Sequence, residues 1–182
     1  MKKMVISVVC AIAFLLGGVN ANAVPLGTDL SDEWVVGHVV PGLPADEENV
    51  EEYLDYLLGM DLGDTETIPR PVGTGTNTFY RSNLGGLPAT TGLSTNRVNV
   101  DGSIGPTVDV SSIVYISAKY ATADGTIFWY VGDLAEVTLP QRFGNSDISN
   151  YTTWAAVPEP ATMLLLGTGL FGLALVRRRF KK

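Results

Sequence analysis

The sequence predicts a mainly β fold: an antiparallel β-sandwich-like domain with one N-terminal amphipathic helix, placed between a signal peptide and a C-terminal transmembrane helix. Short β-type runs follow one another from Thr65 onward, and turn signals separate them at intervals of about 8–12 residues, as in a sandwich. One stretch, at about 46–58, repeats its apolar residues with a helical period. Uncharged apolar runs stand near both ends of the chain. We therefore expect three parts, at 1–23, 24–157 and 158–182.

The first part has the features of a secretory signal peptide. Lys2 and Lys3 precede an uncharged apolar run, and Ala21 and Ala23 occupy the two small positions of a small-x-small cleavage site. Cleavage after Ala23 would make Val24 the first residue of the mature chain. We expect the rest of the chain to be extracytoplasmic up to the second apolar run.

The central part, 24–157, is long enough for one domain with a sizeable core. The only cysteine, Cys10, would be lost with the signal peptide, so this domain must be held together without a disulfide. Seven of the 12 basic residues lie in the two terminal parts, which leaves five basic and 18 acidic residues and a net charge of −13 in the centre. Such a surface excludes nucleic acid as a partner, and it is compatible with binding of divalent cations.

The first elements expected in the domain are a strand at Val35–Val40 and, after a Pro-rich break, a helix. The helix has an acidic start, which suits the positive end of the helix dipole. Its apolar stripe consists of residues spaced at i, i+3, i+4, i+7 and i+8: Val50, Tyr53, Leu54, Leu57 and Leu58. Gly59 is placed to end the helix with a positive φ.

The remaining elements are expected to be strands. Their predicted bounds are Thr78–Arg81, Arg97–Val100, Ser112–Tyr120, Thr126–Val131, Glu136–Leu139 and Ile148–Trp154. Asp124-Gly125 predicts a hairpin between the third and fourth of these. In the third strand the core face is expected to hold Val114, Ile116, Ala118 and Tyr120. In the fourth, Ile127, Trp129 and Val131 share one face, with Phe128 and Tyr130 on the other.

The residues that carry chemistry form no recognisable active site, so we expect no enzyme, no catalytic residue and no cofactor. His38 is the only histidine, and its apolar strand suggests a structural role. The acidic segment 61–66 contains hard oxygen ligands for Ca²⁺ without EF-hand spacing, so Ca²⁺ binding there remains an alternative. The acidic pairs Asp61 with Asp64 and Asp124 with Asp133 have the composition of a glycosidase pair, but many such pairs arise by chance among 18 carboxylates.

The tryptophans raise a further alternative, because Trp34, Trp129 and Trp154 would be able to stack on sugar rings if they were exposed. Large aromatic residues in a sandwich without disulfides are more often part of the core. The sequence leaves the two roles open.

The C-terminal part combines three features in a fixed order. Pro158-Glu159-Pro160 lies just outside an uncharged run, 161–176, which would span about 24 Å as a helix. Arg177, Arg178 and Arg179 follow and mark the cytoplasmic side. Basic side chains can reach the headgroup level, which compensates for a helix somewhat shorter than the hydrocarbon core. The prolines keep the preceding stretch extended.

A Pro-Glu-Pro stretch, a short apolar helix and an arginine cluster at the C-terminus resemble the PEP-CTERM sorting signal of Gram-negative bacteria. The resemblance covers about 26 of 182 residues. It implies processing by an exosortase, a membrane-embedded enzyme of the cysteine peptidase type. It also implies export across the inner membrane, transient anchoring in that membrane by the C-terminal helix, and delivery to the cell surface or extracellular matrix. Family members are linked to exopolysaccharide and biofilm.

The expected function is therefore that of an exosortase-sorted surface or matrix protein, structural or adhesive, associated with exopolysaccharide or other matrix components. Two alternatives remain: a carbohydrate-binding module, and a small hydrolase that acts on the polysaccharide. Exposed coplanar aromatic residues would favour the first. A cleft with two carboxylates about 5–9 Å apart would favour the second.

Overall fold

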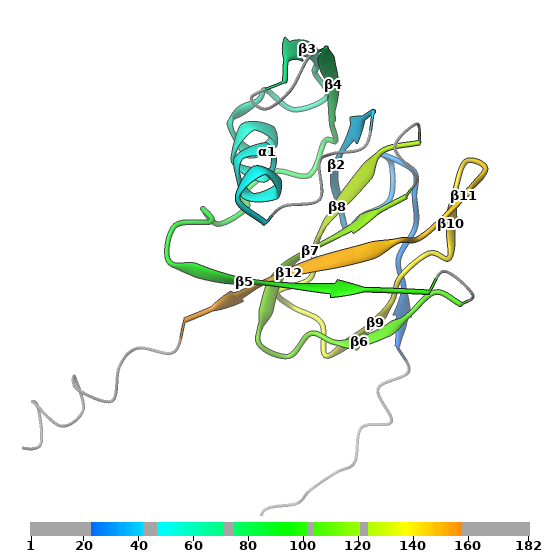
Figure 1. Ribbon diagram of the computed structural model, residues 1–182. Coiled ribbons are helices and arrows are strands. Elements are labelled where there is room, and N and C mark those ends of the chain that lie inside the picture. The colour runs from blue at the N-terminus through cyan, green and yellow to red at the C-terminus, as the bar shows by residue number, and fades with distance from the viewer. Residues whose placement is uncertain (1–22, 42–46, 71–74, 102–103, 121–123, 158–182) are drawn as a thin grey trace, which may run out of the picture.

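A computed structural model describes residues 23–41, 47–70, 75–101, 104–120 and 124–157 (Figure 1). The expected signal peptide, apart from Ala23, and the expected transmembrane helix and basic tail lie outside these residues. Among the residues that the structure describes, no helix is long and apolar enough to cross a membrane.

A seven-stranded sheet in which all neighbouring strands are antiparallel forms the centre of the domain (Figure 1). In spatial order its strands are β3 (Thr65–Pro69), β4 (Thr76–Arg81), β2 (Val35–Val40), β8 (Thr126–Tyr130), β7 (Ile113–Lys119), β12 (Asn150–Ala156) and β5 (Leu93–Asn99). Strands β7 and β8 pair directly, which confirms the predicted hairpin pairing.

Helix α1 (Glu47–Gly59) covers part of one face of this sheet. Its apolar stripe packs on the strands in what we call the helix-side cluster, which consists of Val36, Val39, Val50, Tyr53, Leu54, Leu57, Met60, Phe79, Tyr115, Phe128 and Trp154. Gly59 is the last helical residue and does not have a positive φ, so its predicted role as a left-handed cap is wrong; Gly63 has the positive φ, 81°, after the helix.

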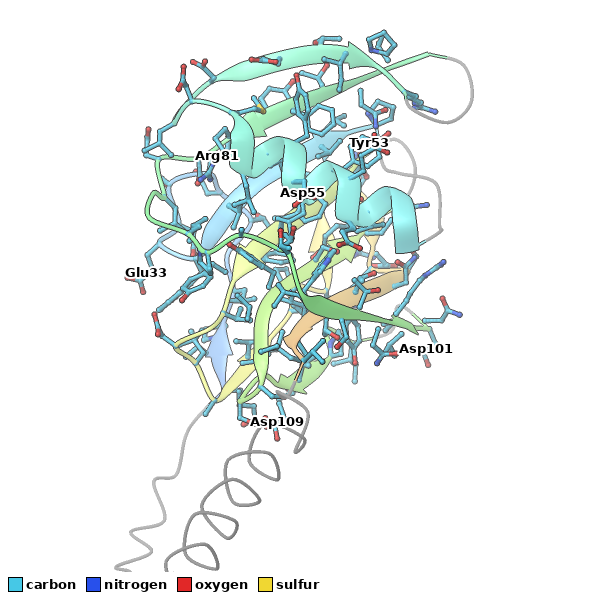
Figure 2. All side chains as sticks on the ribbon, turned by 90° about the vertical axis from the view of Figure 1, so that its left-hand side faces the viewer. Glu33, Tyr53, Asp55, Arg81, Asp101 and Asp109 are labelled. Atoms are coloured by element: carbon cyan, nitrogen blue, oxygen red, sulfur yellow. The ribbon has the colours of Figure 1, made fainter. Side chains whose placement is uncertain are left out.

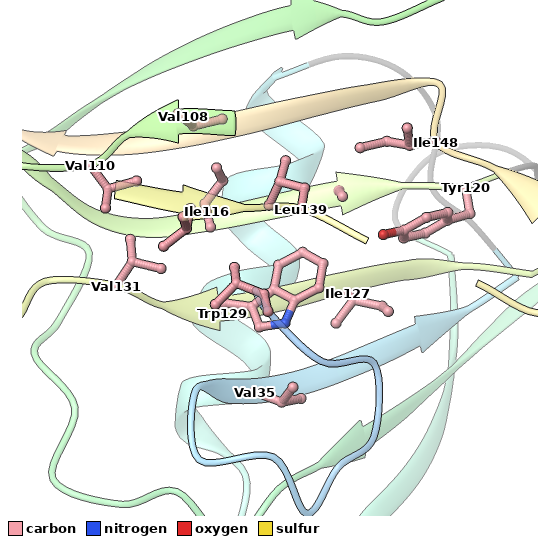
Figure 3. Close-up of a cluster of buried hydrophobic side chains, with 13 residues drawn as sticks. Val35, Val108, Val110, Ile116, Tyr120, Ile127, Trp129, Val131, Leu139 and Ile148 are labelled. Carbon is pink, nitrogen blue, oxygen red and sulfur yellow. The ribbon is translucent and has the colours of Figure 1, made fainter. Parts of the chain in front are cut away.

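The other face is covered by a three-stranded sheet of β1 (Val24–Pro25), β9 (Glu136–Thr138) and β6 (Thr107–Asp109). β6 pairs with β9 in the antiparallel sense, whereas β1 pairs with β9 in parallel. The core between the two sheets, which we call the sheet-side cluster, contains Leu26, Val35, Val108, Val110, Ile116, Ala118, Tyr120, Ile127, Trp129, Val131, Val137, Leu139 and Ile148 (Figure 3). Apart from the parallel β1–β9 pair, the described part of the chain is therefore mainly β with antiparallel sheets and one short helix, as predicted.

The predicted faces of β8 are confirmed, and one position in β7 is wrong. Ile127, Trp129 and Val131 belong to the sheet-side cluster, while Phe128 and Tyr130 pack on the helix side. Ile116, Ala118 and Tyr120 also lie on the sheet side, but Val114 packs against the helix-side cluster. The cause is a β-bulge: Trp154 pairs with Tyr115 and Ala155 with Ile113, so Val114 is an extra residue that reverses the alternation.

Five short strands were not predicted. They are β1, β3, β6 and the two strands of a small hairpin, β10 (Arg142–Phe143) and β11 (Ser146–Asp147). Four of them have only two or three residues, too few to show a period of two. The fifth, β3, is a mostly exposed edge strand with the polar sequence Thr-Glu-Thr-Ile-Pro.

Candidate functional site

The candidate sorting site begins where the folded domain ends. Pro158, Glu159 and Pro160 lie outside the described residues, as do Arg177, Arg178 and Arg179. The last strand, β12, ends at Ala156, and Val157 follows with 53% of its surface exposed. One residue therefore separates the sheet from the motif.

β12 is an interior strand of the sheet, paired with β7 on one side and β5 on the other. Its last residues are held there: the Ala156 amide donates to the carbonyl of Ser112 (3.3 Å), and Ala156 lies opposite Leu93 of β5. Trp154, two residues earlier, is fully buried and lies 6.1 Å from Phe128, ring centre to ring centre. The segment before the motif is thus built into the domain.

Two tight turns flank the end of β12. In the first, the Leu93 amide donates to the Thr90 carbonyl (3.0 Å), and Gly92 has the positive φ (82°) that such a turn requires. In the second, the Ile113 amide donates to the Val110 carbonyl (2.9 Å). We call the exposed residues of these turns, with the preceding aspartate, the C-terminal rim: Thr91, Gly92, Asp109, Ser111 and Ser112.

Asp109 is the one charged residue of the C-terminal rim, and Figure 2 shows it at the end of the domain away from α1. The Ser111 amide donates to its carboxylate (3.0 Å). This bond, followed by one from the Ser111 side chain, lowers the pKa of Asp109 below its ordinary value. The carboxylate is therefore ionised at neutral pH.

The predicted signal peptidase site also adjoins folded structure. Ala21 lies outside the described residues, whereas Ala23 is half-buried and directly precedes β1. Val24 lies opposite Val137 of β9, and the Leu26 amide donates to the Thr138 carbonyl (3.0 Å). A chain that begins at Val24 would have its first residue in a strand.

His38 is a buried residue of β2 with 9% of its surface exposed. Its ring meets Phe143 edge-on with centres 5.1 Å apart. Burial lowers the pKa of His38 to about 4, an effect only partly opposed by a hydrogen bond to the backbone of Thr28 and by the charge of Asp29. The imidazole is therefore neutral at pH 7, as the predicted structural role requires.

The acidic segment 61–66 forms a turn and the start of β3. The Asp64 amide donates to the Asp61 carbonyl (3.2 Å), and the Tyr56 hydroxyl donates to the Glu66 carboxylate. Within the described ranges no group of three or more His, Cys, Asp or Glu side chains is arranged to hold a metal ion.

The predicted acidic pairs do not share a cleft. Asp61 and Asp64 are exposed on one turn, and Asp124 and Asp133 lie beyond opposite ends of β8. A hollow of about 310 Å³ does contain two carboxylates, Asp55 of α1 and Glu66 of β3. Sequence reasoning missed this pair, because the residues are distant in the chain and meet only through packing of α1 on the sheet.

Asp55 and Glu66 are both already hydrogen-bonded within the domain. The Thr90 hydroxyl donates to Asp55, and Tyr56, which also lines the hollow, donates to Glu66. Since the hydrogen bond to Glu66 and, to a smaller extent, burial raise the pKa of Tyr56, its hydroxyl stays protonated at neutral pH. These bonds tie α1 to β3 and to the loop before β5.

The tryptophans do not form an exposed platform. Trp129 and Trp154 are fully buried, and Trp34 is half-buried against the sheet-side cluster. Every aromatic side chain in the described part of the chain is at least half-buried. The rings of Trp129 and Trp154 are therefore not available for stacking on sugar rings.

Comparison with known proteins identifies one feature. Residues 156–179 match the PEP-CTERM protein-sorting motif. No curated protein and no solved structure matches the chain at significant similarity. The match confirms the resemblance seen in the sequence and indicates a secreted protein that is sorted by an exosortase.

Proposed function

We propose that this chain, whose C-terminus carries a PEP-CTERM sorting motif, is a non-catalytic structural or adhesive protein of the surface or extracellular matrix of a Gram-negative bacterium. The match at 156–179 carries the proposal. The helix at 161–176 and Arg177–Arg179 hold the precursor transiently in the inner membrane. The exosortase then cuts within or beside Pro158-Glu159-Pro160, and the domain 24–157 associates with exopolysaccharide or other matrix components.

The packing of the domain supports a structural role over the two alternatives. Both faces of the seven-stranded sheet are occupied by apolar clusters, and both fully buried tryptophans belong to them. A carbohydrate-binding module would instead present such rings at its surface. The carboxylate pair that lines a hollow, Asp55 and Glu66, is engaged by Thr90 and Tyr56, which favours a structural use of both groups.

The test is to replace Pro158, Glu159 and Pro160 together by alanine in the full-length chain. Alanine removes the φ restraints and the charge, and it allows the apolar helix to extend outward. The variant should still be exported and anchored, because 161–176 and the arginines are unchanged. Immunoblots of membrane and matrix fractions should show the full-length form accumulating in the membrane and little or none in the matrix.

Two controls complete this experiment. Replacing Asp133 and Asn145, two exposed residues of the folded domain, by alanine leaves 156–179 unchanged, so sorting should be as in the wild type. A host that lacks its exosortase should retain the wild-type chain in the membrane. Arrival of the triple-alanine variant in the matrix at the wild-type level would show that the motif is only a linker.

A further inference from the structure

We propose that the C-terminal rim is the surface through which the folded domain contacts the extracytoplasmic face of the processing exosortase. The inference rests on the function proposed above and specifies how the substrate is presented. The chain between the sheet and the motif is very short: the motif starts at Pro158, and Ala156 is still part of the sheet. Because one residue spans at most about 3.6 Å, an enzyme that closes around the motif reaches the turns beside β12.

The alternative is that the enzyme draws the end of β12 out of the sheet. That movement would break hydrogen bonds with β5 and β7 together, since β12 is paired on both sides up to Ala155. It would also expose Trp154, which is fully buried in the helix-side cluster. Drawing out an edge strand would break hydrogen bonds with only one neighbouring strand. The interior position of β12 therefore favours recognition with the strand in place, from Val157 onward (Figure 1).

The composition of the rim fits a close contact. Thr91, Gly92, Ser111 and Ser112 have small side chains, so another backbone can approach the turns closely. The rim carries a single charge, that of Asp109, within a domain of net charge −13. Glu136 of β9 lies opposite Asp109, so the exosortase would meet uncharged side chains at the two turns and a pair of carboxylates beside them.

The test is to enlarge the rim in the full-length chain. Thr91→Trp and Ser112→Trp each place a bulky ring on an exposed turn without altering the motif. Misplacement of the scissile bond by about 1 Å can cost about 100-fold in rate, so we expect exosortase-dependent cleavage to slow by about tenfold or more. The matched control is Asn145→Trp, on the exposed β10–β11 turn at the opposite end of β12, which should be cut at the wild-type rate. Pulse-chase labelling measures these rates.

A spacer distinguishes surface contact from misfolding. About six Gly and Ser residues inserted between Val157 and Pro158 would add up to about 20 Å of reach. In chains that carry Thr91→Trp or Ser112→Trp, this spacer should restore the cleavage rate. Wild-type cleavage of both tryptophan variants, or failure of the spacer to restore cleavage, would overturn the rim proposal. Cleavage of the wild-type chain in a host without exosortase would overturn the proposed function as well.

Discussion

The two faces of the seven-stranded sheet bury different polar groups. On the sheet side, His38 lies beside Phe143 with 9% of its surface exposed. On the helix side, Arg81 has 4% of its surface exposed, and its guanidinium donates to the carbonyls of Val36 (2.6 Å) and Leu84 (2.6 Å). Burial lowers the pKa of both groups.

The difference follows from what each side chain can do when it is desolvated. A histidine becomes neutral near physiological pH, whereas an arginine keeps its charge and needs hydrogen-bond acceptors. The stability of the sheet side is therefore expected to depend on pH. The stability of the helix side is expected to depend on the hydrogen bonds between Arg81 and backbone carbonyls. Arg81 ties β2 to the loop after β4 on the side that α1 covers (Figure 2).

The largest effects should come from the two buried tryptophans, one in each cluster. Trp129→Ala and Trp154→Ala should each lower the free energy of unfolding by about 3–5 kcal/mol, because both rings are fully buried. Substitution by phenylalanine distinguishes the two clusters, because only one indole N–H is hydrogen-bonded. Trp129 donates to the Gly27 carbonyl (2.8 Å), whereas the indole nitrogen of Trp154 has no partner. Trp129→Phe should therefore cost about 1 kcal/mol more than Trp154→Phe. Urea unfolding of a chain cut to 24–156 measures both, and equal losses would contradict the difference.

The second prediction concerns pH and the sheet side. The pKa of His38 is about 4 in the folded state and 6.5 ordinarily, so the unfolded chain binds more protons between these values. Stability should be constant above pH 6.5 and fall by up to about 3 kcal/mol as the pH drops to 4. His38→Phe should remove most of this slope, as followed by urea unfolding at several pH values. An unchanged slope in the variant would show that His38 is not the group responsible.

The smallest effects should come from the arginines. Arg81→Met keeps most of the apolar stem but removes the side-chain donors to the carbonyls of Val36 and Leu84, of which Val36 keeps a bond from the Ser82 amide (3.1 Å). It should cost about 1–3 kcal/mol. Arg142→Met is the matched control, because Arg142 forms an exposed ion pair with Asp147 (2.7 Å) and its loss should be hard to detect. Thermal unfolding compares the two. Equal and small shifts would mean that the buried cation does not stabilise the helix side.

The β elements that the sequence predicted well are those with a repeated pattern. Val35–Val40 matches β2, and the alternation in Thr126–Val131 identified both faces of β8 correctly. The helix expected at about 46–58 is observed as α1, since its apolar stripe is long enough to show a period. Val114 was misassigned because a bulge depends on the neighbouring strand, β12, and leaves no local signal.

The polar contacts were less predictable than the strands. Asp55 meets Thr90 across 35 positions, and Trp129 bonds to Gly27 across 102, so neither contact has a local signature. The sorting motif could be predicted because its information is contiguous, within 156–179. The short distance along the chain between the motif and the sheet could not be predicted, because this distance depends on where β12 ends.

The most direct test of the account is the intact mass of the protein recovered from the matrix of its native host. We predict the mass of a chain that begins at Val24 and ends within or beside Pro158-Glu159-Pro160. That result would confirm removal of both terminal parts and delivery of the folded domain. A mass that still includes Arg177–Arg179 would contradict exosortase processing.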